Sequence, residues 1–303
     1  MNDILNSTDL ADFVCKNRSS GVSMQNNDLS SLPKLTRSEI LELGSTLAYD
    51  ETLAALRPKN KNFVWHVAMQ KSGCTWVTQV LSTGLKQRGW DTINLIPMAR
   101  RREQEVSPIE LLRQKKLENN VFAIQQHCMY SEYAVSFIKR FNVKLLLQVR
   151  SITDCIVSNI DHINNESVEF PFAYLDKEQW LNFSKAQQLQ FIMDFVVPWY
   201  IKFWVSWTTG LKQHNIPYKV ISYEHLIHDP QTEFLNITNY FDSAISCTDI
   251  KNWLDISQQR PTRKNKAVAG RGKSLPAWVH SKLRQLTDFY PNVDFTPLGI
   301  IKN

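Results

Sequence analysis

The sequence predicts one α/β domain built around a central, mainly parallel sheet with helices on its faces. Short continuous apolar runs, typical of strands covered on both sides, occur at residues 62–69, 121–124, 143–149 and 218–221. Patterns with helical spacing alternate with these runs, which implies right-handed crossovers between parallel strands. Ligands of such sheets bind at the carboxyl ends of the strands, so we expect the functional residues there.

The first strand is followed by a helix with a clear end. This helix is predicted over 75–88, because its apolar residues recur at helical spacing and Gly89 provides a stop. Another helix is expected at 38–56, where Glu39 and Glu42 give an acidic first turn. Further helical patterns cover residues 132–141, 152–163 and 187–211.

Two segments do not follow this alternation. Residues 1–35 are polar and weakly periodic, so we predict a flexible N-terminal segment in front of a domain spanning 36–303. The charged, irregular segment 91–118 has the character of an insertion over a site, with a helix expected from Pro108. No internal repeat or low-complexity linker marks a boundary within the domain.

The composition narrows the class of protein. A formal net charge of +6 suits an anionic ligand but is modest for a nucleic-acid-binding protein. Five cysteines without a Cys-x-x-Cys pair indicate neither a disulfide framework nor a zinc site. The N-terminus lacks the features of a secretory signal, and charged residues interrupt the most apolar stretch, 189–207. We therefore expect a cytoplasmic protein that binds neither nucleic acid nor a membrane, and its oligomeric state stays open.

The most informative motif is the turn between the first strand and its helix. Backbone N–H groups of such a turn and of a helix N-terminus point at one spot, where the helix dipole also favours an anion. A lysine in the turn adds a full positive charge. Because the lysine precedes the only glycine, the spacing is not that of the nucleotide triphosphatase loop, and an ordinary turn is the alternative to a phosphate site. The residues of the turn are Lys71, Ser72, Gly73, Cys74, Thr75 and Trp76.

This turn resembles a loop of the cytosolic-type sulfotransferases, which use 3′-phosphoadenosine 5′-phosphosulfate (PAPS). Their loop reads Pro-Lys-Ser-Gly-Thr-Thr-Trp, and five of its seven positions match residues 70–76. The resemblance implies a P-loop-like sulfotransferase fold in which residues 71–76 bind the cofactor. It further implies that Lys71 neutralises the charge that grows on the oxygen bridging to the departing 5′-phosphate.

A second matching segment joins the end of a buried strand to the next helix. Arg150 follows the strand at 143–149, and Ser158 comes eight residues later. In the sulfotransferases an arginine and a serine at this separation hold the 3′-phosphate of the cofactor, and Asp154 matches the aspartate between them. The alternative is an i,i+4 ion pair between Arg150 and Asp154 at a helix start.

His127 is the candidate catalytic base. It ends the second long apolar run, and an unperturbed histidine pKa near 6.5 suits proton abstraction at neutral pH. The resemblance implies this role, because the family has Lys-x-His here and its histidine removes the proton of the acceptor. The family lysine is replaced by Gln125, so one positive charge is missing. A histidine with a purely structural place is the alternative.

The remaining matches lie near the C-terminus. Tyr223 begins a segment similar to the family's Tyr-Glu-Asp-Leu, whose tyrosine borders the adenine, with Trp76 as the other aromatic wall. A turn ending a strand would also explain this segment. The family closes its cofactor site with Arg-Lys-Gly, and the assignment here stays open between two dipeptides of the basic segment 263–273. The candidates are Arg263 with Lys264 and Arg271 with Gly272.

Together the matches imply transfer of a sulfonyl group from PAPS, without a metal ion, to a hydroxyl or amine of a small-molecule acceptor. The product of the cofactor would be adenosine 3′,5′-bisphosphate (PAP). A natural product such as an alkaloid is one acceptor class, since Asp161, Glu166 and Glu169 would suit a cation. The alternatives are a P-loop-like small-molecule kinase and a non-catalytic nucleotide-binding module. Aromatic candidates for the acceptor pocket are Trp65, His66, Tyr130, Phe170, Phe172 and Tyr174.

Overall fold

The computed structural model describes most of the chain from residue 60 onward. The expected flexible segment 1–35, the helix expected at 38–56 and the helix expected from Pro108 lie outside the described residues. So do Phe170 and Phe172 among the aromatic candidates. The described ranges are 60–96, 105–106, 119–165, 175–259 and 268–301.

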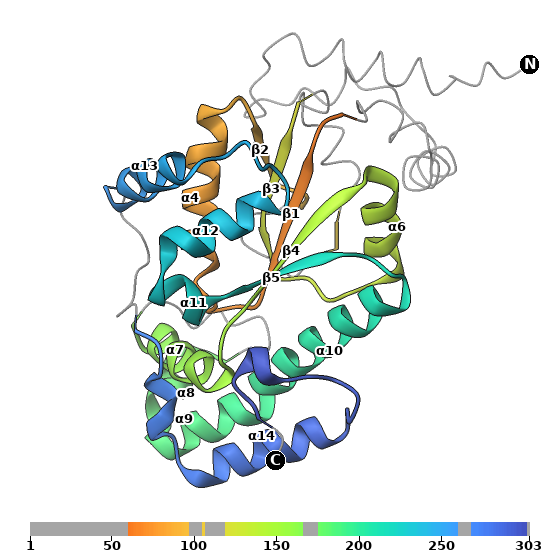
Figure 1. Ribbon diagram of the computed structural model, residues 1–303. Helices are drawn as coiled ribbons and strands as arrows, with labels where there is room; N and C mark the ends of the chain where they lie inside the picture. The colour runs from red at the N-terminus through yellow and green to blue at the C-terminus, as the bar shows by residue number, and fades with distance from the viewer. Residues whose placement is uncertain (1–59, 97–104, 107–118, 166–174, 260–267, 302–303) are drawn as a thin grey trace, which may run out of the picture.

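A five-stranded, fully parallel sheet in the order β2-β3-β1-β4-β5 forms the centre of the domain (Figure 1). This confirms the predicted fold class. The register between β1 and β3 shifts between Trp65 and Val67, a bulge of the kind that re-aims side chains near functional sites. The strands are β1 (Phe63–Ala68), β2 (Asp91–Ile93), β3 (Val121–Gln126), β4 (Val143–Val149) and β5 (Tyr218–Ser222).

Helices cover both faces of the sheet. The predicted helices after β1, β3 and β4 are confirmed within two residues at each end. In chain order, the helices before β5 are α4 (Cys74–Gln87), α6 (Glu132–Phe141), α7 (Ile152–Asn165), α8 (Lys177–Asn182), α9 (Lys185–Phe191) and α10 (Val197–Gln213). The helices after β5 are α11 (Tyr223–His228), α12 (Pro230–Asn239), α13 (Cys247–Gln258) and α14 (Ala277–Asp288), with short 3₁₀ turns η3 (Arg271–Ser274) and η4 (Thr296–Leu298).

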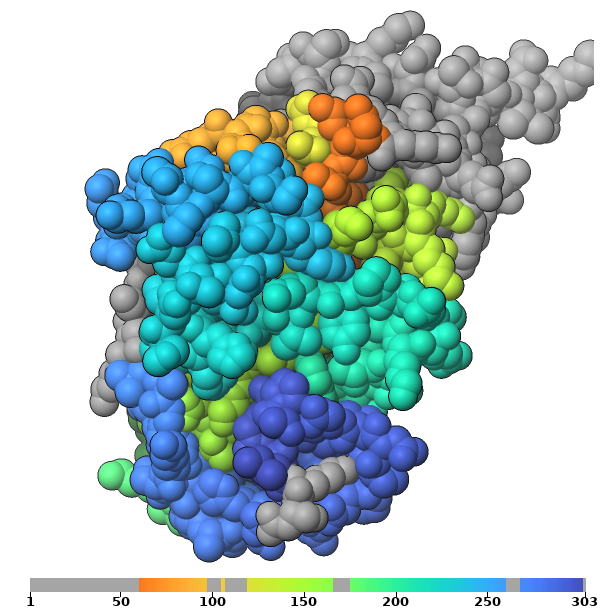
Figure 2. All heavy atoms as spheres, viewed as in Figure 1, coloured from red at the N-terminus to blue at the C-terminus, as the bar shows by residue number. Residues whose placement is uncertain are grey.

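Two apolar cores lie on opposite faces of the sheet. On one face Val64, Phe122 and Leu146 pack beneath α4, α12 and α13. On the other face the alternate strand residues, such as Trp65 and Leu145, pack against α6 and α10. The helix α14 contacts α10 beyond the carboxyl ends of the strands, and the blue C-terminal residues form the lower end of the molecule in Figure 2.

The helix expected at 187–211 is interrupted. A π-helical turn, η2 (Ile192–Val196), separates α9 from α10, because Pro198 has no N–H to continue the α-helical hydrogen bonds. The apolar stretch at 189–207 is largely buried, as predicted for a core helix. Within the described parts of the chain, no helix is both long and apolar enough to cross a membrane.

Gly84 lets two helices approach closely on one face of the sheet. A Cβ atom at this position of α4 would lie 1.8 Å from the ring of Trp253 on α13. The Trp253 ring is 1% exposed and belongs to the core beneath these helices. The contact fixes α13 beside α4, and the turn at the start of α4 carries the motif predicted to bind phosphate.

Candidate active site at the carboxyl ends of the strands

The turn between β1 and α4 has the geometry of an anion-binding loop. Lys71 and Gly73 have positive φ angles of 61° and 81°, and Gly73 caps α4 without a side-chain hydrogen bond to the helix N-terminus. The Ser72 hydroxyl donates to the carbonyl of Met69 at 2.6 Å, which closes the turn. Such a turn directs backbone N–H groups into a concavity, where the helix dipole adds positive potential.

A buried hydrogen-bond network holds this loop from below. The Gln148 amide donates to the Ser72 carbonyl at 2.6 Å, and its oxygen lies 2.8 Å from His66 Nε2. Because an amide oxygen only accepts, Nε2 carries the proton, and Nδ1 can accept from the Thr78 hydroxyl at 3.3 Å. His66 was a candidate for the acceptor pocket. Its side chain is 0% exposed, so it supports the loop and does not line a pocket.

Arg150 lies at the end of β4 and contacts the loop directly. Its guanidinium donates to the carbonyls of Lys71 at 3.1 Å and Val268 at 3.2 Å. The same group forms an ion pair with Asp154 at 3.4 Å and lies 4.0 Å above the centre of the Tyr223 ring. The i,i+4 ion pair that the sequence left as an alternative is therefore present. It occurs together with the loop contacts and does not replace them.

Asp154 fastens the basic C-terminal segment to α7. Its carboxylate accepts the backbone N–H groups of Gly270 at 2.8 Å and Gly272 at 2.7 Å, in addition to the Arg150 ion pair. Arg271 forms a second link, a 2.6 Å ion pair with Asp161. The donors that the sequence placed on a phosphate at 271–272 thus bind protein carboxylates in this structure. The same ion pair neutralises Asp161, one of the three acidic residues suggested for a cationic acceptor.

His127 follows β3 and is half-buried beside the end of β1. Its Nδ1 lies 2.7 Å from the carbonyl oxygen of Ala68. Since that oxygen can only accept, Nδ1 is the protonated nitrogen, and Nε2 carries the lone pair of the neutral ring. This hydrogen bond orients the imidazole in the way that a general base requires.

Of the remaining predicted phosphate-binding residues, the structure describes Ser158. Ser158 is 5% exposed on α7, the helix whose first turn carries Asp154. Arg263 and Lys264 lie outside the described residues. Among the residues that the structure does describe, no group of three or more His, Cys, Asp or Glu side chains is arranged to hold a metal ion.

A scan against protein-family models matches residues 61–282 to the sulfotransferase domain. The chain belongs to the sulfotransferase family. The match covers most of the chain and includes every segment described above, from the anion-binding loop to the basic segment. No curated protein in a sequence search matches it significantly.

Solved structures of other sulfotransferases share the fold of this sulfotransferase. The mouse sulfotransferase SULT7A1 complexed with PAP is 17% identical, with a TM-score of 0.58 over 86% of this chain and 93% of that one. A retinol dehydratase in complex with androsterone and the inactive cofactor PAP is 13% identical, with a TM-score of 0.52 over 82% of this chain and 88% of that one. At these identities the likeness concerns the fold alone.

Tyr223 of this sulfotransferase forms one wall of the loop. A Cβ atom on Gly73 would lie 2.6 Å from the Tyr223 ring, so only glycine leaves room for this contact. Burial raises the pKa of the Tyr223 hydroxyl, although the Arg150 charge opposes the shift. Trp76 is half-buried and packs edge-to-face on Phe234 of α12, with ring centroids 5.6 Å apart.

The aromatic candidates for an acceptor pocket are not confirmed. Trp65 is 0% exposed and packs within the core against Trp207, as an internal residue of β1. Tyr130 also packs edge-to-face on Trp207, and its hydroxyl donates to Glu132 at 2.9 Å. Tyr174 lies outside the described residues.

Proposed function

We propose that this sulfotransferase transfers the sulfonyl group of PAPS to a hydroxyl or amine of a small-molecule acceptor and releases PAP. One observation carries the proposal: an anion-binding loop lies between an arginine that ends β4 and an oriented histidine that follows β3. The PAP complexes of the mouse sulfotransferase and the retinol dehydratase support the same cofactor. A kinase of the P-loop type would need a differently spaced loop.

The residues fit such a donor. The buried Nε of Arg150 has no hydrogen-bond partner in the part of the chain that the structure describes, which leaves a donor for an anion. In the proposal Arg150 and Ser158 bind the 3′-phosphate, with Arg263 and Lys264 from the basic segment. Arg271 and Gly272 position that segment through the carboxylates that they contact. Tyr223 and Trp76 border the adenine.

The proposed sulfonyl transfer depends on the positions of the Lys71 charge and of the base His127. PAPS supplies an activated sulfonyl group, and an in-line displacement of this kind depends on positioning and charge stabilisation. His127 Nε2 takes the proton of the acceptor. Lys71, with the amides of Ser72, Gly73, Cys74 and Thr75, stabilises the negative charge that grows on the leaving phosphate.

The acceptor is proposed as a small alcohol, phenol or amine. A natural product of the alkaloid type was one expectation, but Asp161, part of its support, is neutralised by Arg271. The other two acidic residues, Glu166 and Glu169, lie outside the described residues. The complex of the retinol dehydratase with androsterone supports a hydroxyl acceptor.

Incubation with PAPS and a panel of alcohols, phenols and amines is expected to produce PAP in an acceptor-dependent manner. Replacing Lys71 with alanine should slow this reaction about 100- to 1,000-fold, as loss of a transition-state charge partner does. Lys251→Ala, at an exposed position of α13, is the matched control and should leave the rate unchanged. Phosphoryl transfer from ATP in place of sulfonyl transfer would favour the kinase alternative.

A further inference from the structure

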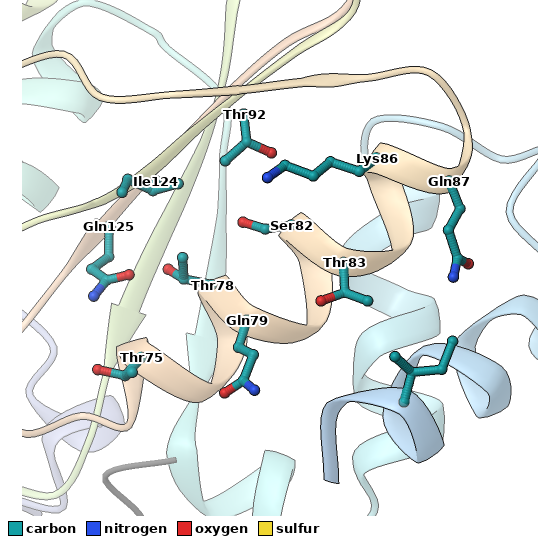
Figure 3. Close-up of a pocket in the computed structure, with 11 residues that line it drawn as sticks. Thr75, Thr78, Gln79, Ser82, Thr83, Lys86, Gln87, Thr92, Ile124 and Gln125 are labelled. Carbon is teal, nitrogen blue, oxygen red and sulfur yellow. The ribbon is translucent and has the colours of Figure 1, made fainter. Parts of the chain in front are cut away.

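A pocket of about 650 Å³ lies between α4 and the strands β2 and β3, with Ile256 of α13 at its border. Figure 3 shows Thr78 and Ser82 on the side of α4 that faces Thr92 of β2, and Lys86 reaches toward the same strand. Thr75 and Gln125 lie together at the end nearest the anion-binding loop (Figure 3). The other lining residues are Gln79, Thr83, Gln87, Ile124 and Ile256.

Four residues that line this pocket each carry a buried side-chain oxygen that has no hydrogen-bond partner among the described residues. These atoms are the hydroxyl oxygens of Ser82, Thr83 and Thr92 and the side-chain oxygen of Gln125. Thr83 and Gln125 are only 8% and 3% exposed. Buried polar groups in folded proteins are almost always hydrogen-bonded, so this concentration indicates groups that are reserved for a ligand.

The lining selects the class of ligand. Hydroxyl and carboxamide groups both donate and accept, and they match the hydroxyl groups of a sugar or polyol. The methyl groups of the threonines, with Ile124 and Ile256, offer apolar surface for the C–H faces of a ring. A purely apolar acceptor would leave the polar atoms unpaired, which is unfavourable. From Thr75 to Lys86 the helix rises about 16 Å, enough for two or three sugar rings.

The cavity is connected to the proposed reaction centre. Thr75 belongs to the anion-binding loop, and Gln125 precedes the candidate base His127 by two residues. Thr78 also contacts His66, whose network reaches the Ser72 carbonyl through Gln148. A molecule bound along α4 would therefore have one end beside the loop that holds the donor.

We infer that this cavity binds a polyhydroxylated acceptor, a saccharide or glycoside, and presents one of its hydroxyl groups for sulfonyl transfer. The inference rests on the proposed function and narrows its acceptor class. Gln125 then contributes to acceptor binding. Its amide oxygen accepts a hydrogen bond from the acceptor, at a position where the family has a lysine.

The test uses 4-nitrophenyl glucoside, galactoside, xyloside and maltoside as acceptors with PAPS, and 2-naphthol as the sugar-free comparison. The double variant Ser82→Ala/Thr83→Val removes two of the unpartnered hydroxyls at nearly constant shape. We expect KM for the preferred glycoside to rise about 10-fold or more, because each hydrogen bond to a ligand contributes about a 2- to 10-fold effect. KM for 2-naphthol and the affinity for PAP should not change.

A stability measurement separates a binding role from a structural one. Because the two hydroxyls have no hydrogen-bond partner among the residues that the structure describes, the double variant should melt at the same temperature as the wild type or higher. Thr248→Val, exposed on α13, is the matched control and should change neither quantity. A lower melting temperature with unchanged KM would overturn the inference, as would better turnover of 2-naphthol than of every glycoside.

A direct binding measurement tests this inference separately from the proposed function. Saturation-transfer NMR with the same glycosides, without PAPS, should detect binding to the wild type and weaker binding to the double variant. Glycoside binding without sulfonyl transfer would contradict the proposed function and leave the cavity as a saccharide site. Sulfonyl transfer to 2-naphthol with no glycoside binding would overturn the inference alone.

Discussion

Replacing His127 with alanine is expected to lower turnover about 100- to 10,000-fold, the usual contribution of a positioned general base. The physical reason is the hydrogen bond from Nδ1 to the Ala68 carbonyl, which fixes the tautomer in which Nε2 is the basic nitrogen. The loop, Arg150 and the network beneath them remain intact in the variant. The affinity for PAP, measured by calorimetry, should therefore stay within about twofold of the wild type, since separate sites act independently.

His225→Ala is the matched control, because its side chain is exposed on α11. This control should keep full turnover. Normal turnover in His127→Ala would show that another group takes the proton, even in a functional sulfotransferase. A parallel loss of PAP affinity would instead assign His127 a structural role at the end of β1.

Replacing Arg150 with alanine is expected to remove the preference for a 3′-phosphate. Hydrogen bonds to charged groups contribute about 1.5–3 kcal/mol, so the affinity for PAP should fall about 10- to 150-fold. Adenosine 5′-monophosphate lacks the 3′-phosphate, and its affinity should change much less. Calorimetric titration of both nucleotides gives the ratio that tests this role.

The variant Arg150→Lys is a control that distinguishes a lost phosphate contact from a general loss of structure. Arg150→Ala leaves the buried Asp154 carboxylate without its counter-ion, whereas lysine keeps the charge. Lysine cannot reproduce the several fixed donors of the guanidinium, so PAP affinity should still fall, by a smaller factor. Arg284→Ala, exposed on α14, is the control. Equal losses for both nucleotides would contradict a specific 3′-phosphate contact.

The parts of the site that depend on local order were predictable from the sequence. The apolar run before Lys71 and the helical pattern after Gly73 predicted β1, the turn and α4, and the structure confirms all three. Arg150 and His127 follow buried strands that lie on either side of β1, so the prediction that both lie at one edge of the sheet is correct. Their roles toward a cofactor remain proposals.

The parts that depend on contacts between distant segments were not predictable. Asp154 binds amides 116 and 118 residues further along the chain, and nothing in its local pattern distinguishes this from an ion pair with Arg150. His66 was placed in a pocket because aromatic residues suit one, but on β1, the central strand of the sheet, it is buried against Gln148. The strand β2 has only three residues, too few for a recognisable pattern.

Calorimetric titration with PAP, adenosine 5′-monophosphate and ATP tests the central claim most directly. The account predicts tight binding of PAP, much weaker binding of adenosine 5′-monophosphate, and no need for a divalent cation. The difference between the first two nucleotides isolates the 3′-phosphate that Arg150 is proposed to bind. A preference for ATP, or equal affinity for PAP and adenosine 5′-monophosphate, would contradict the assignment of this site to PAPS.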